Sequence, residues 1–374
     1  MGAVMKKWLQ KAVALVSSML TVAAVACVAL RMPVAASQNA AVAAAGFIMP
    51  GGAIRVMKDG FVEEDEEDDG IPSARSASSA VSSAPVFSLP PRSSEGGANA
   101  SSAAAASGLP ASKGGGITEM TVGNSGTQYQ NIWVKNSNKN HGIDIAGELK
   151  KQPAIKIIKN ASTPQVLIYH THTTEAFRPN DSSPNDSSQY RSRDASRSVV
   201  AVGDRIAAQL EAAGIKTLHD TTLHDYPMYN GSYNRSKATM QKDLKKYPGI
   251  QVTLDIHRDA MEMKDNTRGK PTTVINGKKA AQIMVICGCD DDGTLGFPNW
   301  EYNLRFAVRL QKSLADRYPT LAKPLNFLPR KYNENMTKGS LLIEVGTEVN
   351  TVDEVKYSGD MLGKALAAVL DRLT

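Results

Sequence analysis

The stretch "QVLIYHTHTTEAF", Gln165 to Phe177, runs four apolar residues directly into two histidines and a glutamate. Residues 166–169 are apolar without alternation, which is typical of a strand that is buried on both faces of a sheet. In α/β sheets, functional side chains gather beyond the carboxyl ends of the strands. The stretch therefore predicts a buried strand and a following loop that presents His170, His172 and Glu175 at the sheet edge.

Two other short apolar runs end in the same way. Residues 252–256, "VTLDI", run into His257, and residues 340–343, "SLLI", run into Glu344. A further run, "AQIMVICGC" at residues 281–289, also suits a buried strand. We expect the three strands that end in polar side chains to bring them to one edge of the sheet.

Segments with helical periodicity lie between and after these runs. Residues 196–214, 299–319 and 357–373 each place apolar side chains on one stripe, and the first segment stops at Gly214, a good C-terminal cap. Alternating strands and helices predict an α/β fold with a mostly parallel twisted sheet and helices on both faces.

The N-terminus carries a membrane-targeting pattern. Lys6, Lys7 and Lys11 precede an uncharged run from residue 12 to residue 30, about the length that a membrane-crossing helix requires. Three lysines before the run, against a lone Arg31 after it, orient the rest of the chain outward. We expect residues 1–34 to form a cytoplasmic N-terminus and a single transmembrane signal anchor, with a cleaved signal peptide as the alternative.

Residues 35–125 are dominated by Ala, Ser, Gly and Pro and are expected to form a disordered, flexible linker. The acidic run Glu63 to Asp69 inside it is interpreted as a solvated stretch, with a docking site for a basic partner as the alternative. Residues 126–374 are expected to form one extracytoplasmic domain. Beyond residue 125 the chain has 34 Lys or Arg against 27 Asp or Glu, and outside a membrane the polyanions that could meet this charge are wall polymers and lipid headgroups.

The cysteines do not predict a disulfide framework. The chain has three cysteines, and only Cys287 and Cys289 fall outside the apolar N-terminal run. We interpret these two as small core residues at the end of a strand, with metal ligation or a strained disulfide as less favoured alternatives.

Histidines and a glutamate at the ends of separate strands predict a metal site. Neutral imidazoles with a carboxylate suit zinc (Zn2+), with one coordination position left for water. Zinc lowers the pKa of that water to about 7, and a nearby carboxylate can carry its proton to a leaving nitrogen. The pattern favours amide hydrolysis, and the chain lacks the G-x-S-x-G motif of serine hydrolases.

Four motifs, "PQVLIYHTHTTEAF", "LHDTTLHDYPMYNGSYNRS", "LDIHRDA" and "LLIEVGTEVNT", resemble in this order the stage II sporulation protein P family of membrane-anchored peptidoglycan hydrolases. The resemblance covers roughly residues 130–374 and the anchor and tether layout. A wider resemblance joins the chain to zinc-dependent N-acetylmuramoyl-L-alanine amidases, and it implies an amidase-like domain fold.

The resemblance also implies roles for particular residues. His172 and His257 match the first and second zinc histidines, and Glu344 matches the catalytic glutamate. The third ligand departs from the amidases, whose glutamate opens the helix after the first loop, because this chain has Asp194 near that place. Glu175 and Asp194 are both candidates, and His170 is a further one.

The substrate that the resemblance implies is peptidoglycan. The expected reaction is cleavage of the N-acetylmuramoyl-L-alanine amide bond, and the family is also reported to cut peptide cross-links. The implied setting is engulfment of the forespore, with stage II sporulation proteins D and M as partners. Arg258, Tyr233 and Arg235 are expected to bind substrate, although packing explains Tyr233 and Arg235 equally well.

Two rival interpretations can be told apart. An amidohydrolase barrel also begins with a histidine pair at a strand end, but about 250 residues with this few strands do not supply eight βα units. A non-catalytic wall-binding scaffold of the same fold remains the alternative from another class of function, and it predicts that Glu344 is dispensable.

Overall fold

The computed structural model describes residues 116–263 and 267–374. The expected anchor and the acidic run lie outside the described residues. None of the helices within the described ranges is long and apolar enough to cross a membrane.

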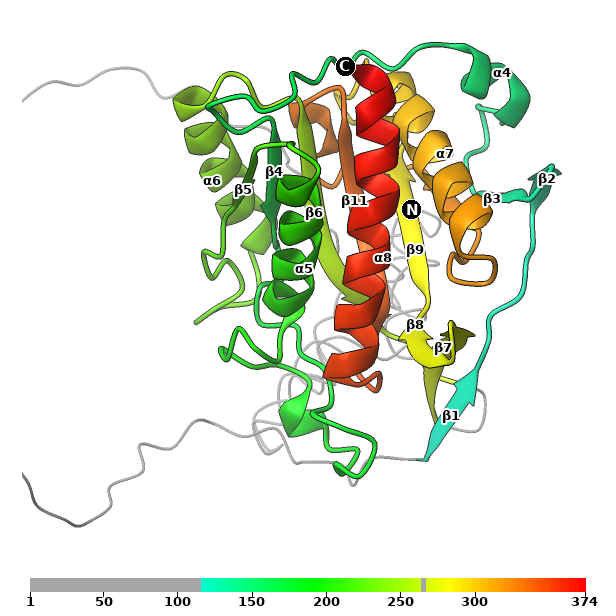
Figure 1. Ribbon diagram of the computed structural model, residues 1–374, viewed down its shortest axis with the longest axis vertical. Coiled ribbons are helices and arrows are strands. Elements are labelled where there is room, and N and C mark those ends of the chain that lie inside the picture. Colours follow the sequence, from blue (N-terminus) through cyan, green and yellow to red (C-terminus); the bar gives the residue numbers. More distant parts are fainter. Residues whose placement is uncertain (1–115, 264–266) are drawn as a thin grey trace, which may run out of the picture. The chain divides into compact units, whose positions relative to one another are not determined.

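An eight-stranded sheet forms the centre of the described domain, in the order β2-β3-β10-β9-β11-β6-β4-β5 (Figure 1). Five of its seven neighbouring strand pairs are parallel, and β2–β3 and β9–β11 are antiparallel. The prediction of an α/β fold with a mostly parallel sheet is therefore confirmed. The strands are β2 (Thr127–Tyr129), β3 (Ile132–Asn136), β4 (Val166–Tyr169), β5 (Thr217–His219), β6 (Val252–Asp259), β9 (Ile283–Gly288), β10 (Leu325–Leu328) and β11 (Ser340–Thr347).

The antiparallel pairing of β9 with β11 divides the sheet into two halves. Strands β5, β4, β6 and β11 run in one direction, while β9, β10 and β3 run in the other. Carboxyl ends of the first group therefore lie at one edge of the sheet, and those of β9, β10 and β3 lie at the opposite edge.

Helices cover both faces of this sheet, as predicted. Val166 and Ile168 of β4 belong to the main apolar cluster, which includes side chains of α5, α7 and α8, whereas Leu167 and Tyr169 pack with Met240 of α6 on the other face. The helices are α4 (Ile145–Lys150), α5 (Val199–Ala212), α6 (Ser232–Lys246), α7 (Trp300–Arg317) and α8 (Val352–Leu370), and three-residue 3-10 turns occupy Ser187–Gln189, Glu334–Met336 and Asp371–Leu373.

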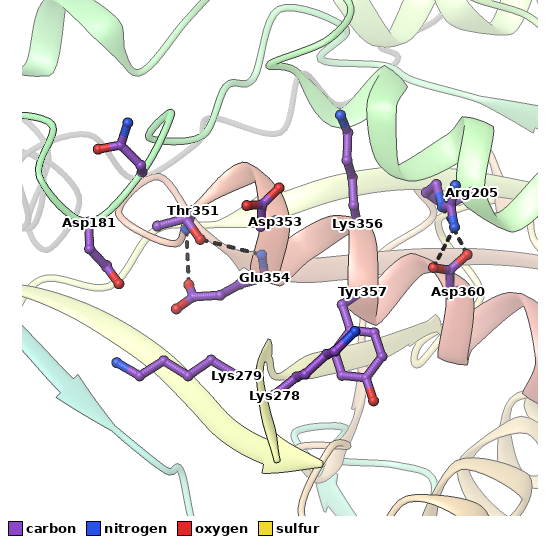
Figure 2. A pocket seen from close by; sticks show the side chains of 11 residues that line it. Asp181, Arg205, Lys278, Lys279, Thr351, Asp353, Glu354, Lys356, Tyr357 and Asp360 are labelled. Carbon is purple, nitrogen blue, oxygen red and sulfur yellow. Dashed lines mark hydrogen bonds and ion pairs between the residues drawn. The ribbon is translucent and has the colours of Figure 1, made fainter. Parts of the chain in front are cut away.

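Capping residues set where the helices begin and end. The Ser198 side chain accepts a hydrogen bond from Val200 N at the start of α5, and Gly214, with a φ of +75°, follows its end. Helix α8 begins at Val352, earlier than the expected residue 357. Thr351 and Glu354 form a capping box there, in which each side chain accepts a hydrogen bond from the backbone N–H of the other residue. Both residues line a charged surface hollow (Figure 2).

A second, three-stranded sheet has the order β1-β7-β8 and comprises β1 (Ile117–Met120), β7 (Arg268–Ile275) and β8 (Lys278–Ala281). Strand β1 pairs in parallel with β7, so folded chain begins before the expected linker boundary at residue 125. Lys270 of β7 is buried, and its ammonium lies 2.8 Å from Glu354 of α8 and 2.6 Å from Asp181. These ion pairs attach β7 to the main body of the domain.

Candidate active site

The carboxyl ends of β4, β6 and β11 are neighbours at one edge of the sheet. In the parallel pairing of β11 with β6, Glu344 is the register partner of His257, and β4 pairs with the other side of β6. The loop after β4 carries His172 and Glu175. The structure thus brings His172, Glu175, His257 and Glu344 to this edge, and their roles remain predictions.

Two imidazoles and a carboxylate lie in contact there. The His172 and His257 rings are perpendicular, with centroids 5.1 Å apart, and His257 Nδ1 lies 3.5 Å from Glu175 Oε2. His257 Nε2 lies 2.9 Å from Asp255 Oδ1 on the same strand. All four side chains are at most 3% exposed, so the group is shielded from bulk water.

Sequence reasoning did not single out Asp255. The available signal was an aspartate inside the otherwise apolar run "VTLDI", because a buried carboxylate needs a cation or hydrogen bonds to stabilise it. Asp255 receives both: Thr171 donates its backbone N–H at 2.8 Å and its hydroxyl at 2.6 Å, and His257 is the cationic partner. Burial alone would raise the pKa of Asp255, but His257 and Thr171 lower it below the usual value.

The two histidines differ in charge state. Burial lowers the pKa of His172 to about 3, so its ring is neutral and one of its nitrogens has a lone pair that can bind a ligand or accept a hydrogen bond. Burial also opposes the charge on His257, but Asp255 and Glu175 outweigh it and raise its pKa well above the usual value. Burial would raise the pKa of Glu175, yet His257 and Arg258 lower it, so Glu175 is an anion.

Arg258 holds the loop that carries Glu175. Its backbone N–H donates to Glu175 Oε2 at 3.0 Å, and its guanidinium donates to the carbonyls of Ala176 at 3.1 Å and Tyr190 at 3.0 Å. The guanidinium also lies 3.5 Å from the buried Glu348 carboxylate. The side chain expected to bind substrate therefore has interior partners that fix the site loop, and a substrate contact remains a prediction.

Aromatic side chains enclose His172. The Tyr229 ring stacks on it with centroids 4.6 Å apart, and Tyr233 of α6 meets it edge-on at 5.6 Å. The Tyr229 hydroxyl is 3.2 Å from His172 Nε2, and the Ser232 hydroxyl is 3.3 Å from Nδ1. Arg235 donates to the carbonyls of the loop before α6, including Met228 O at 2.6 Å, and so it orders the segment that presents Tyr229.

The two other candidates for the third ligand lie apart from this group. Asp194 is in an exposed turn, where it accepts hydrogen bonds from the backbone N–H and hydroxyl of Ser196, and within the described ranges no contact joins it to either histidine of the site. His170 points toward Gly203 of α5 and contacts His219, with 2.9 Å between the two Nε2 atoms. Of the three candidates for the third ligand, Glu175 is thus the one that the fold places beside His257.

Fold and site together define an α/β protein with a buried histidine–carboxylate cluster where three strands of its sheet end. The chain belongs to the family Stage II sporulation protein P (SpoIIP), whose model matches residues 113–367, and this confirms the resemblance seen in the sequence. "Stage II sporulation protein P" of Bacillus subtilis (strain 168) is 26% identical over 267 residues, which cover 65% of this chain and 63% of that relative. The match therefore spans less than two thirds of the relative's length.

Solved structures with some likeness include three amidases. N-acetylmuramoyl-L-alanine amidase AmiC2 of Nostoc punctiforme is 13% identical, covers 57% of this chain and 98% of its own, and has a TM-score of 0.32. The CwlD amidase of Clostridioides difficile, solved in complex with the GerS lipoprotein, is 11% identical, with coverages of 56% and 98% and a TM-score of 0.33. The N-acetylmuramyl-L-alanine amidase Ami1 of Mycobacterium smegmatis is 13% identical, with coverages of 57% and 100% and a TM-score of 0.32.

Proposed function

We propose that this protein is a zinc-dependent peptidoglycan hydrolase that cleaves the N-acetylmuramoyl-L-alanine amide bond, and also peptide cross-links, during sporulation engulfment. The observation that carries the proposal is the meeting of His172, Glu175 and His257 at the sheet edge, with Glu344 in register beside His257. Membership of the SpoIIP family supports the sporulation setting.

The donor set fits zinc. Two imidazoles and one carboxylate are common ligands of catalytic zinc, and they leave a position for water. A histidine that binds a metal usually donates its other N–H to a carboxylate, which fixes the ring. His257 lies between two carboxylates, because its Nε2 is 2.9 Å from Asp255 Oδ1 while its Nδ1 faces Glu175. His172 would hold the metal with Glu175 and with His257, whose Nδ1 proton the metal would displace, and bound zinc would supply a water with a pKa of about 7.

The chain's own residues would then act around the scissile amide. Glu344, which is 9% exposed, would accept a proton from the attacking water and pass it to the leaving nitrogen. Asp255 holds His257 in one orientation, and Arg258 holds the loop of Glu175. Tyr229 and Tyr233 cover the His172 ring and limit access of water to it.

A digestion assay with ligand variants tests this proposal. Purified sacculi are incubated with the full-length chain in zinc or in chelator, and released soluble fragments are measured. We expect release with zinc, loss of release with chelator or with Glu175→Gln, and retained release with the matched variant Asp194→Asn. Binding to sacculi without any release under all conditions would instead support a wall-binding scaffold.

The cellular location is also a proposal. Three lysines before the uncharged run at residues 12–30 support a membrane anchor with the domain outside the cytoplasm, in the septal space between mother cell and forespore. A tether of about 80 residues before β1 would span roughly 50 Å as a random chain, so the domain would work near the membrane. Stage II sporulation proteins D and M are the partners we propose.

Protease treatment of intact and permeabilised cells tests the location. We expect the domain to be digested in spheroplasts without permeabilisation. Protection of the domain until the membrane is opened would contradict the proposed orientation.

A further inference from the structure

A second group of metal-type side chains lies at the other edge of the sheet. Cys289 and Asp291 directly follow β9, and His141 lies on the segment between β3 and α4. Strands β3 and β9 both run parallel to β10 and therefore end at the same edge. Because β9 is antiparallel to β11, that edge is opposite the one where His257 and Glu344 lie.

The three side chains converge closely. One donor atom from each of His141, Cys289 and Asp291 can be chosen so that all three lie within 4.8 Å of one another. The first comes from a part of the sequence about 150 residues away from the other two, so the fold alone brings them together. Among the described residues, no other three histidine, cysteine or acidic side chains bring one donor atom each so close together.

Backbone hydrogen bonds hold the group in place. Asp291 accepts the N–H of Lys139 at 3.0 Å and the N–H of Asn140 at 2.9 Å, which ties the segment of His141 to the end of β9. The His141 ring lies against Trp300, with centroids 4.8 Å apart. Ligating carboxylates in metal sites are typically held by hydrogen bonds of this kind, as Asp291 is here.

The Cys289 thiol is a buried group that forms no disulfide. The described part of the chain offers this thiol no hydrogen-bond partner. Its neighbour Cys287 differs, because the Cys287 thiol lies 3.6 Å from the carbonyl of Gly288 and outside the group. The fold thus points a buried sulfur donor at a histidine and an aspartate.

The donor types select a class of metal. A thiolate with an imidazole and a carboxylate suits zinc and similar divalent transition metals, whereas magnesium and calcium prefer oxygen ligands alone. His141 and Asp291 also line a surface hollow with Asn140, Gly293 and Trp300, which gives a metal a route of entry and an outer position for water.

We propose that His141, Cys289 and Asp291 form a second metal site, which takes a divalent transition metal such as Zn2+ and fastens the segment between β3 and α4 to the end of β9. The site goes beyond the proposed hydrolase function and does not depend on it. Its alternative is that Cys289 is only a small core residue.

Cobalt binding separates this site from the candidate active site. A thiolate ligand gives bound Co2+ an intense charge-transfer band in the near ultraviolet, whereas His172, Glu175 and His257 contain no sulfur. The full-length chain is purified in mild detergent with Cys27→Ala, which leaves Cys287 and Cys289 as its thiols. We expect one equivalent of Co2+ to produce the band and Zn2+ to abolish it by competition.

Matched variants locate the band. Cys289→Ser should remove it, and Cys287→Ser, which changes the neighbouring buried thiol, should keep it. His141→Gln alters a half-buried side chain with little risk to folding, and it should weaken metal affinity at least about tenfold. If Cys289→Ser does not fold, His141→Gln carries the test.

Two results would overturn the proposal: no band at excess Co2+, or an unchanged band and affinity in His141→Gln. His172→Gln distinguishes the two metal sites. This variant should keep the thiolate band while binding one equivalent of metal fewer than the wild type. If the candidate active site binds no metal, the thiolate band should still appear.

Discussion

Removing the Arg258 side chain should destabilise the domain strongly. The residue is 8% exposed, and its guanidinium holds the carbonyls of Ala176 and Tyr190. In Arg258→Ala, the carboxylate of Glu348, which is 2% exposed, keeps only Arg268 at 3.7 Å as a cationic partner among the described residues. Breaking a buried ion pair by removing one partner costs about 3–5 kcal/mol. We expect the free energy of unfolding to fall by about that amount, a large part of the roughly 5–15 kcal/mol of a typical domain.

A second arginine provides the control for this prediction. Arg205 makes a bidentate ion pair with Asp360, in which Nε donates to Oδ1 at 2.9 Å and Nη2 donates to Oδ2 at 2.7 Å (Figure 2). The Arg205 side chain is 47% exposed. Pairs of this exposure contribute up to about 1 kcal/mol, so Arg205→Ala should lower the free energy of unfolding by no more than that.

Urea denaturation of the purified variants measures both changes. Arg258→Lys keeps the positive charge but cannot reach several acceptors at once, so its loss should lie between those of wild type and Arg258→Ala. If Arg258→Ala loses no more stability than Arg205→Ala, the buried contacts of Arg258 do not hold the site loop, and the reasoning is refuted.

Three further predictions concern stability, and each is measured by urea denaturation. Thr351→Ala removes the capping box with Glu354 and should cost about 0.5–2 kcal/mol, while Thr351→Ser should cost less; equal losses would contradict the capping role. Burial raises the pKa of Glu334 well above its usual 4.5, so above pH 4.5 the folded chain keeps a proton that the unfolded chain loses. The free energy of unfolding of the wild type should therefore fall, relative to that of Glu334→Gln, as the pH rises above 4.5. A gap independent of pH would refute this. Gly288→Ala would place a Cβ 2.1 Å from Arg330 O and should cost about 1–3 kcal/mol, and an unchanged stability would show that the strand end adapts freely.

Short apolar runs were sufficient to predict four of the eight strands of the main sheet. Strands β4 and β9 lie within the runs identified in the sequence, because strands buried on both faces are apolar throughout. Strands β6 and β11 begin with their runs but continue past them to Asp259 and Thr347. The direction of β9 could not be predicted, because an apolar run has the same composition whether its strand pairs in parallel or antiparallel. The β1–β7–β8 sheet was missed because ion pairs of the buried Lys270, rather than an apolar pattern, attach it.

The candidate site was predictable in outline but not in its third ligand. His172, His257 and Glu344 were found because each comes after an apolar run, although His257 and Glu344 lie inside β6 and β11 rather than beyond their ends. The choice between Glu175 and Asp194 depends on how a loop of more than 20 residues packs. Long-range contacts made by Arg258 decide that packing, and no local pattern encodes them.

The central claim is that Glu344 serves a zinc-dependent cleavage of the muramoyl-alanine amide. Its most direct test is mass spectrometry of the new termini after digestion of sacculi by the full-length chain with zinc, beside Glu344→Gln and the exposed control Glu211→Gln. The account predicts peptides with a free L-alanine amine from wild type and Glu211→Gln, and none from Glu344→Gln. Equal release by Glu344→Gln, or the absence of a free L-alanine amine from every digest, would contradict it.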